Sequence, residues 1–395
     1  MTGMRPDMGP GAALPPPQQA LAVALKGDIR EEARRAVLAG VTDADAVRIA
    51  AEEEDVLPLL AWRIERLGLL DTGSWRPLRH RLQIAMAVAR AEADWRRRCV
   101  SHVLGALRSA GIAAVPIKGI WLAERLYPEP WCRRMGDADL VVAGEPRTIL
   151  DRLAAHGIGP KNDDPAILDH ACSEGDEITV YARWPGASAI DLHFRLYPDM
   201  PLAAAAEIIA RAEPDVCLGV EILAPAPADH LIVVAHHLIL GTAKPPWRWW
   251  LDVDLAARAV RDWPTVASRS IGWGNPAIVL IALAGAHQLF DTPVPDWIWG
   301  ALAEALTPGE RPVVAAALAH GAWQADRDAL LVCQWRERGL GWRDRSLTRM
   351  LWPHPGFVAR RLKVPSTAPR FWVKRLGFAA GRFARAARAV VLSKW

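Results

Sequence analysis

The chain has 395 residues, of which 51% are hydrophobic, which is enough for a large core and predicts two or three domains. The five cysteines are scattered and form no CxxC pair, which argues against a disulfide framework and against a structural zinc site. The formal net charge of +4 is uneven: residues 341–395 hold thirteen Arg and Lys against one Asp, so this tail is basic and the rest of the chain is mildly acidic.

The first 18 residues are rich in proline and glycine, have no apolar signal core, and are predicted to form a disordered leader. The longest apolar run, AIVLIALAGA at 277–286, is too short to span a bilayer. Together with the cysteine pattern, these features predict a cytoplasmic protein.

Residues 19–110 are predicted to form a helical N-terminal region, because apolar residues recur there at spacings of three and four. Asp55 is the expected N-cap of one helix in this region and Gly68 its expected end. From 111 to 200 the pattern changes to short strands and helices, which predicts an α/β core with a mixed sheet. The expected strands are IAAVPI, DADLVV, EITVYARW and SAIDLHF.

Residues 201–335 again show the apolar pattern of helices and are predicted to form a helical domain. Residues 336–395 form the basic C-terminal tail, and within it 374–395 would make a basic amphipathic helix. Such a helix fits a peripheral contact with an anionic membrane or a docking contact with a protein. Nucleic acid is not an expected partner, because the helical regions show no template or primer surface.

Two acidic residues, Asp137 and Asp139, stand at the start of the predicted strand DADLVV. Residues at i and i+2 of a strand point to the same face, so the two carboxylates repel each other unless a cation neutralises them. Mg²⁺ prefers such oxygen ligands, and Mn²⁺ is the alternative. A third carboxylate, Asp191 in SAIDLHF, would join them if the two strands are neighbours. The alternative for these residues is a turn or capping role.

The order of these features resembles the nucleotidyltransferase superfamily built on the DNA polymerase β palm. The segments PIKGIWLAERLYPEPWCRRMGDADLVV and IDLHFRLYP, and later PADHLIVVAHHLILGTAKPPWRWWLDVDLAAR, are similar to an uncharacterised bacterial nucleotidyltransferase family sometimes called type 5. The resemblance covers roughly residues 80–330. It implies an α+β fold in which a small palm-like mixed sheet is flanked by N-terminal and C-terminal helical regions.

The activity that the resemblance implies is metal-dependent transfer of a nucleoside monophosphate, with ATP as the expected donor, to a hydroxyl acceptor. Asp137, Asp139 and Asp191 would hold the metal, and Asp191 would also help to deprotonate the acceptor. A small molecule is preferred over a protein hydroxyl as acceptor. The alternative is a non-catalytic nucleotide sensor or scaffold that uses the basic tail as an anchor.

Phosphate binding is predicted for Lys118, Gly119, Arg133, Arg134 and His193. The superfamily has Gly-Ser where this chain has Lys118-Gly119, so the lysine would replace a hydroxyl as a point charge while the glycine allows close approach. A surface role is the alternative for Lys118 and for one of the two arginines. For His193 the alternative is a structural hydrogen bond.

Two other clusters are predicted to be structural. The histidines at 230, 236 and 237 have no HExxH pattern or cysteine partner, so a core role is preferred over zinc binding. The tryptophans at 247, 249 and 250 are expected to pack on the core, with a stacking wall for the substrate as the alternative.

Overall fold

The computed structural model describes residues 14–160, 177–197, 200–201, 203–242 and 244–320, with a few isolated positions elsewhere. Residues 1–13 and most of the basic tail, including most of the predicted helix over 374–395, lie outside the described residues. Helix α1 begins at Pro16, inside the segment predicted as leader. No helix in the described ranges is long and apolar enough to cross a membrane.

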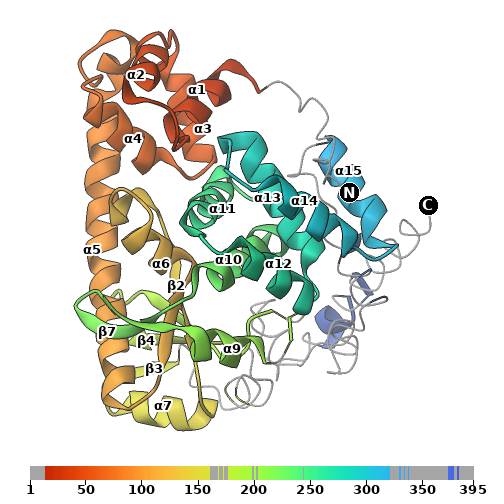
Figure 1. Cartoon of the computed structure of the whole chain (residues 1–395). Helices are drawn as coiled ribbons and strands as arrows, with labels where there is room; N and C mark the ends of the chain where they lie inside the picture. The colour runs from red at the N-terminus through yellow and green to blue at the C-terminus, as the bar shows by residue number, and fades with distance from the viewer. Residues whose placement is uncertain are drawn as a thin grey trace.

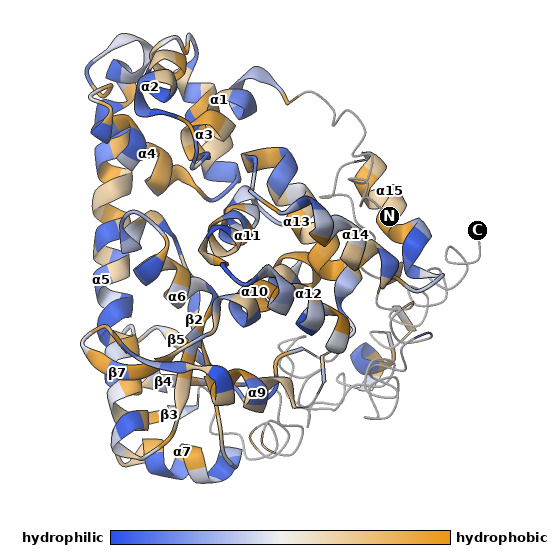
Figure 2. Ribbon diagram, in the orientation of Figure 1, coloured by the Kyte–Doolittle hydropathy of each residue, from blue (hydrophilic) through white to orange (hydrophobic). Residues whose placement is uncertain are grey.

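The chain begins with helices that end in one long helix, α5, which runs along one side of the molecule (Figure 1). They are α1 (Pro16–Leu25), α2 (Glu31–Ala39), α3 (Ala44–Glu53), α4 (Leu57–Arg66), the 3₁₀ turn η1 (Gly73–Leu78) and α5 (Arg79–Ser109). Hydrophilic and hydrophobic residues alternate along α5 (Figure 2), so one helix can face both the core and solvent.

One predicted helix boundary in this region is wrong. Asp55 does not cap α4, whose N-cap is Val56 without a side-chain hydrogen bond. Asp55 instead forms an ion pair with Arg248, with 2.9 Å between Oδ2 and Nε. Gly68 does follow the end of α4, at a φ of 67° that favours glycine.

A mixed five-stranded sheet follows, which confirms the predicted mixed sheet in an α+β chain. Its order is β1-β2-β5-β4-β3, where β2 and β5 are parallel and the other pairs are antiparallel. The elements are β1 (Ala114–Ile117), α6 (Lys118–Arg125), η2 (Pro130–Cys132), β2 (Asp137–Val142), α7 (Pro146–Ala154), β3 (Ile158–Pro160), β4 (Glu177–Ala182) and β5 (Ala189–His193). The edge strand β3 was not predicted.

The two faces of the sheet belong to two separate hydrophobic clusters. Leu140, Ile190 and Val180 represent the face that joins the cluster containing residues of α5 and α7. Val115 and Val141 lie on the other face and join the larger cluster, which contains the N-terminal and C-terminal helices. The second face also carries the acidic residues of β2, because they have the same strand parity as Val141.

The chain then becomes helical, apart from an antiparallel hairpin that was not predicted. The elements are α9 (Ala204–Arg211), β6 (Glu213–Cys217), β7 (Val220–Ala224), α10 (Pro227–Gly241), α11 (Trp247–Ala259), α12 (Trp263–Gly272), α13 (Pro276–Phe290), α14 (Asp296–Glu304) and α15 (Glu310–His320). Helices α10, α11 and α13 contact one another and form the centre of the larger cluster.

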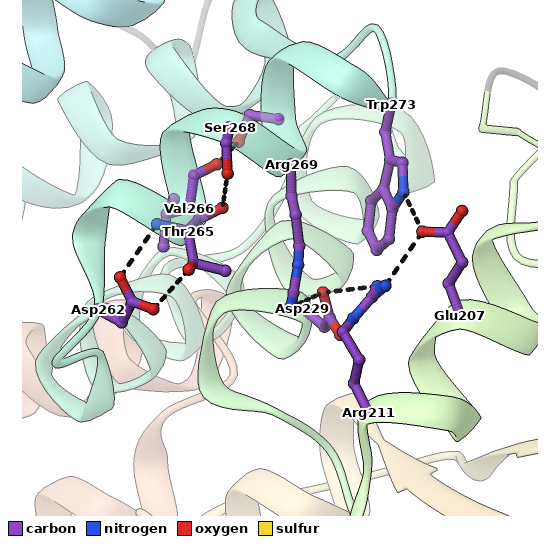
Figure 3. A network of polar contacts seen from close by, with 10 residues as sticks. Glu207, Arg211, Asp229, Asp262, Thr265, Val266, Ser268, Arg269 and Trp273 are labelled. Carbon is purple, nitrogen blue, oxygen red and sulfur yellow. Dashed lines mark hydrogen bonds and ion pairs between the residues drawn. The ribbon is translucent and has the colours of Figure 1, made fainter.

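A polar network fixes the position of α10 (Figure 3). Asp229, fully buried in the first turn of α10, accepts hydrogen bonds from Arg211 of α9 and Arg269 of α12. Glu207 of α9 accepts a hydrogen bond from the indole of Trp273 at 3.0 Å. A buried carboxylate needs such partners, so α9, α10 and α12 are held together at this end.

Candidate active site

Strands β2 and β5 bring the three predicted aspartates together on one face of the sheet. Asp137 and Asp139 lie two residues apart in β2, and Asp139 is the Cα partner of Asp191 in the parallel strand β5. Asp137 is the most exposed of the three, Asp191 is intermediate, and Asp139 is buried. The acidic row therefore runs from an open end at Asp137 to a closed end at Asp139.

Asp139 is held by two nitrogen donors. The Nζ of Lys118 lies 2.8 Å from its Oδ1, and Nε2 of His193 lies 2.7 Å from the same oxygen. Because a carboxylate can only accept, this histidine nitrogen carries the hydrogen. Burial alone would raise the pKa of Asp139, but the charge of Lys118 and the contact with His193 outweigh burial and hold the pKa far below its usual range.

The other two aspartates show the opposite shift. Burial and then the charge of Asp139 raise the pKa of Asp137. Burial also raises the pKa of Asp191, against the hydrogen bond from Thr179, and the charges of the other two aspartates raise it further. These carboxylates are therefore short of cationic partners, which is the condition that a bound cation would relieve.

The carboxylate oxygens of this site are the kind of donor that a hard divalent cation prefers. Asp191 Oδ1 is buried and has no hydrogen-bond partner within the described residues, and an orphaned carboxylate oxygen of this kind is a natural metal ligand. The two hydrogen bonds described for Asp139 are both accepted by its Oδ1. As the side chains stand, no three His, Cys, Asp or Glu in the described ranges are grouped closely enough to hold a metal ion.

A fourth carboxylate, Glu177, was missed by the sequence analysis. It lies in β4, which pairs with β5 so that Glu177 is the partner of His193 and Thr179 the partner of Asp191. Burial raises the pKa of Glu177, while His193 lowers it and Asp191 raises it. The alternation in EITVYA places Glu177 and Thr179 on one face, but only the pairing of β4 with β5 shows that this is the acidic face.

Lys118 is buried at 7% exposure, so it is not a surface lysine. Its backbone φ of 51° lies in the left-handed region, which is uncommon for a non-glycine residue. Its N–H donates a 3.0 Å hydrogen bond to Nε2 of His230 on α10. Burial, followed by the charge of Arg133, lowers the pKa of His230 to about 3, so the ring stays neutral and keeps this acceptor.

Arg133 is also buried, and its guanidinium is occupied by a carboxylate of α11. Its Nε and Nη2 lie 2.9 Å and 2.6 Å from the two oxygens of Asp252, which also accepts a hydrogen bond from Tyr127. A Cβ on Gly119 would lie 2.4 Å from Nη1 of Arg133. The absence of a side chain at Gly119 therefore makes room for this ion pair.

Replacing Arg133 by methionine is expected to lower the free energy of unfolding by about 3–5 kcal/mol, because it leaves the buried charge of Asp252 without its partner. Denaturant unfolding measures this change. The exposed Arg134, whose Nη1 lies 3.4 Å from Asp55, is the matched control and should shift stability by about 0.5 kcal/mol or less when replaced in the same way. Equal stability of the two variants would contradict a structural role for Arg133.

The remaining candidates divide into buried and half-exposed groups. Trp247 and Trp250 are buried, as the packing prediction expects. Trp249 is only partly buried and lies 4.1 Å from the ring of His237. Burial and then the charge of Lys118 lower the pKa of His237 to about 3, so this pair lies within electrostatic reach of the site.

The chain is similar to one protein family over more than half of its length. The family model described as an uncharacterised nucleotidyltransferase matches residues 41–291. The match includes β2, β5, α10 and α11, and therefore every residue of the site described above. A search of curated proteins gave no match.

Proposed function

The chain belongs to the uncharacterised nucleotidyltransferase family, and from this premise we propose that it transfers AMP from ATP to a hydroxyl acceptor in a Mg²⁺-dependent reaction. The observation that carries the proposal is the register that sets Asp139 opposite Asp191, with Asp137 two residues away on the same face. Mn²⁺ is the alternative ion. The preferred acceptor is a small molecule, with a protein hydroxyl second.

In this proposal Asp137, Asp139 and Asp191 hold the divalent cation. Bound there, the cation would neutralise the three carboxylates and stabilise negative charge on the phosphates. The contacts from Lys118 and His193 fix the orientation of Asp139 and balance its charge. They leave Asp139 charged at any physiological pH.

Asp191 is the proposed base. Its Oδ1 is buried and makes no hydrogen bond within the described residues, so this carboxylate has an oxygen with which to accept a proton. The acceptor hydroxyl gives its proton to Asp191 as its oxygen forms a bond to the α-phosphorus. The bond from that phosphorus to the bridging oxygen of the β-phosphate breaks, and pyrophosphate leaves with the electron pair.

Transfer from labelled ATP tests the proposal. Label in the α-phosphate should appear in a new compound when the protein is incubated with Mg²⁺ and a small-molecule extract. Label in the γ-phosphate should appear only in pyrophosphate. The transfer should stop with EDTA and in Asp191→Asn. Binding of ATP without any transfer of label, across extracts and both metals, would favour the nucleotide sensor instead.

A further inference from the structure

A turn of α5 lies beside the open end of the acidic row. The indole of Trp95 donates a 2.6 Å hydrogen bond to the carbonyl of Gly186, and the sulfur of Cys99 accepts one from the N–H of Ser188 at 3.5 Å. This loop leads directly into β5, whose first residue, Ala189, is the Cα partner of Asp137. Arg96 lies between the two contact points on α5.

The helix face that carries Arg96 also contacts the segment that leads into β2. Glu92, one turn earlier and on the same helix face, approaches Arg134, with 3.9 Å between Oε2 and Nε. The charges of Glu92 and Asp137 both act on Arg96 and favour its protonated form, although burial, the larger effect, lowers its pKa. Its guanidinium is thus within electrostatic reach of Asp137.

Among the described residues, no carboxylate is close enough to form an ion pair with Arg96. It is partly buried, and its Nε is fully buried without a hydrogen bond to any described residue. Three other cations lie near the acidic row, and each is paired: Lys118 with Asp139, Arg133 with Asp252 and Arg134 with Asp55. Arg96 forms no ion pair within the described ranges.

We propose that Arg96 binds the polyphosphate of the nucleoside triphosphate, the part that leaves as pyrophosphate. This inference rests on the proposed function and names a residue that sequence reasoning did not select. The planar guanidinium presents several donors in a geometry that matches phosphate oxygens. Arg96 lies near Asp137, at the open end of the acidic row. This position suits the β- and γ-phosphates, which follow the reacting α-phosphate.

Calorimetric titration of ATP and of inorganic tripolyphosphate, both with Mg²⁺, tests the inference. Arg96→Met should weaken binding of both ligands by about 10- to 100-fold, the usual effect of losing a hydrogen bond between charged groups. Arg96→Lys should lose less affinity for both ligands, because lysine keeps the positive charge but lacks the planar guanidinium with its several donors. The matched control is Arg98→Met, an exposed arginine of the same helix, which should bind like the wild type.

Thermal melting separates ligand binding from a structural role. A cation kept for ligand binding is costly to the free protein, so Arg96→Met should melt at the same temperature as the wild type or higher. If Arg96→Met does not fold, the titration of Arg96→Lys tests the inference instead. Wild-type affinity of Arg96→Lys for tripolyphosphate would overturn the inference.

The other possible results of the titrations also test the inference. If Arg96→Met and Arg98→Met weaken ligand binding equally, the effect comes from the loss of a surface charge, and the inference is overturned. Normal ligand binding by Arg96→Met, with label transfer intact in the wild type, overturns the inference but leaves the proposed function standing. A wild type that binds neither ligand overturns both.

Discussion

Replacing Asp139 by asparagine is expected to lower both nucleotidyl transfer and stability. Transfer should fall by about 10²- to 10³-fold or more, because under the proposed function the variant loses a charged ligand of the cation that would stabilise the phosphates. The free energy of unfolding should fall by about 3–5 kcal/mol, because the buried ammonium of Lys118 loses its partner. Single-turnover transfer and denaturant unfolding of one preparation measure the two effects.

A double variant separates these effects. Adding Lys118→Met to Asp139→Asn removes the unpaired cation, so most of the lost stability should return, while transfer should stay low. Asp151→Asn, on the exposed surface of α7, is the control for a simple change of charge and should affect neither property. Normal transfer by Asp139→Asn would exclude this residue as a metal ligand.

Asp137→Asn is expected to show a comparable loss of transfer, of about 10²- to 10³-fold, without a loss of stability. Asp137 makes no ion pair to a described residue, and burial and repulsion from Asp139 raise its pKa. Its charged form is therefore disfavoured in the folded state. Removing that charge should leave the melting temperature unchanged or raise it.

The pH dependence of stability provides a second test of whether the charge of Asp137 destabilises the folded protein. For an acid whose pKa is raised by folding, the stability it contributes is fully present below the unfolded pKa and is lost as the pH rises through the folded pKa. Any stability advantage of Asp137→Asn should therefore appear at neutral pH and shrink below about pH 4, where aspartate is protonated even in the unfolded chain. Melting curves across this range measure it. A variant that is less stable than the wild type at neutral pH would contradict the assignment.

The strands of the acidic face could be predicted because alternation is a local property of the sequence. DADLVV and SAIDLHF gave β2 and β5 and the shared face of Asp137 and Asp139. The same reasoning treated the aspartates as mutually repelling, which predicts that Asp139→Asn leaves the stability unchanged or raises it slightly. The structure reverses that sign, because Lys118 follows Ile117, the antiparallel partner of Asp139 in β1.

The rest of the site depends on contacts between distant segments. Arg133 and Asp252 are 119 residues apart, and no periodicity links them. Arg133 and Arg134 were equally plausible phosphate ligands in the sequence. In the structure Arg133 is buried against the carboxylate of Asp252, whereas Arg134 is exposed. Sequence reasoning did not select Glu177 or Arg96 for the same reason, because their surroundings depend on which strand pairs with β5 and which helix contacts the loop before it.

The contacts of Arg133 and Lys118 bear on how such an enzyme can change over evolutionary time. The segment between η2 and β2 supplies the cation of the Arg133–Asp252 pair, and α11 supplies the anion. The first residue of α6, Lys118, supplies an N–H, and α10 supplies its acceptor, His230. A graft of residues 111–200 onto a foreign helical domain would therefore bury an uncompensated charge and an unsatisfied amide. Substitutions in exposed loops should therefore be tolerated more readily than an exchange of residues 111–200, because the exchange would break both of these contacts.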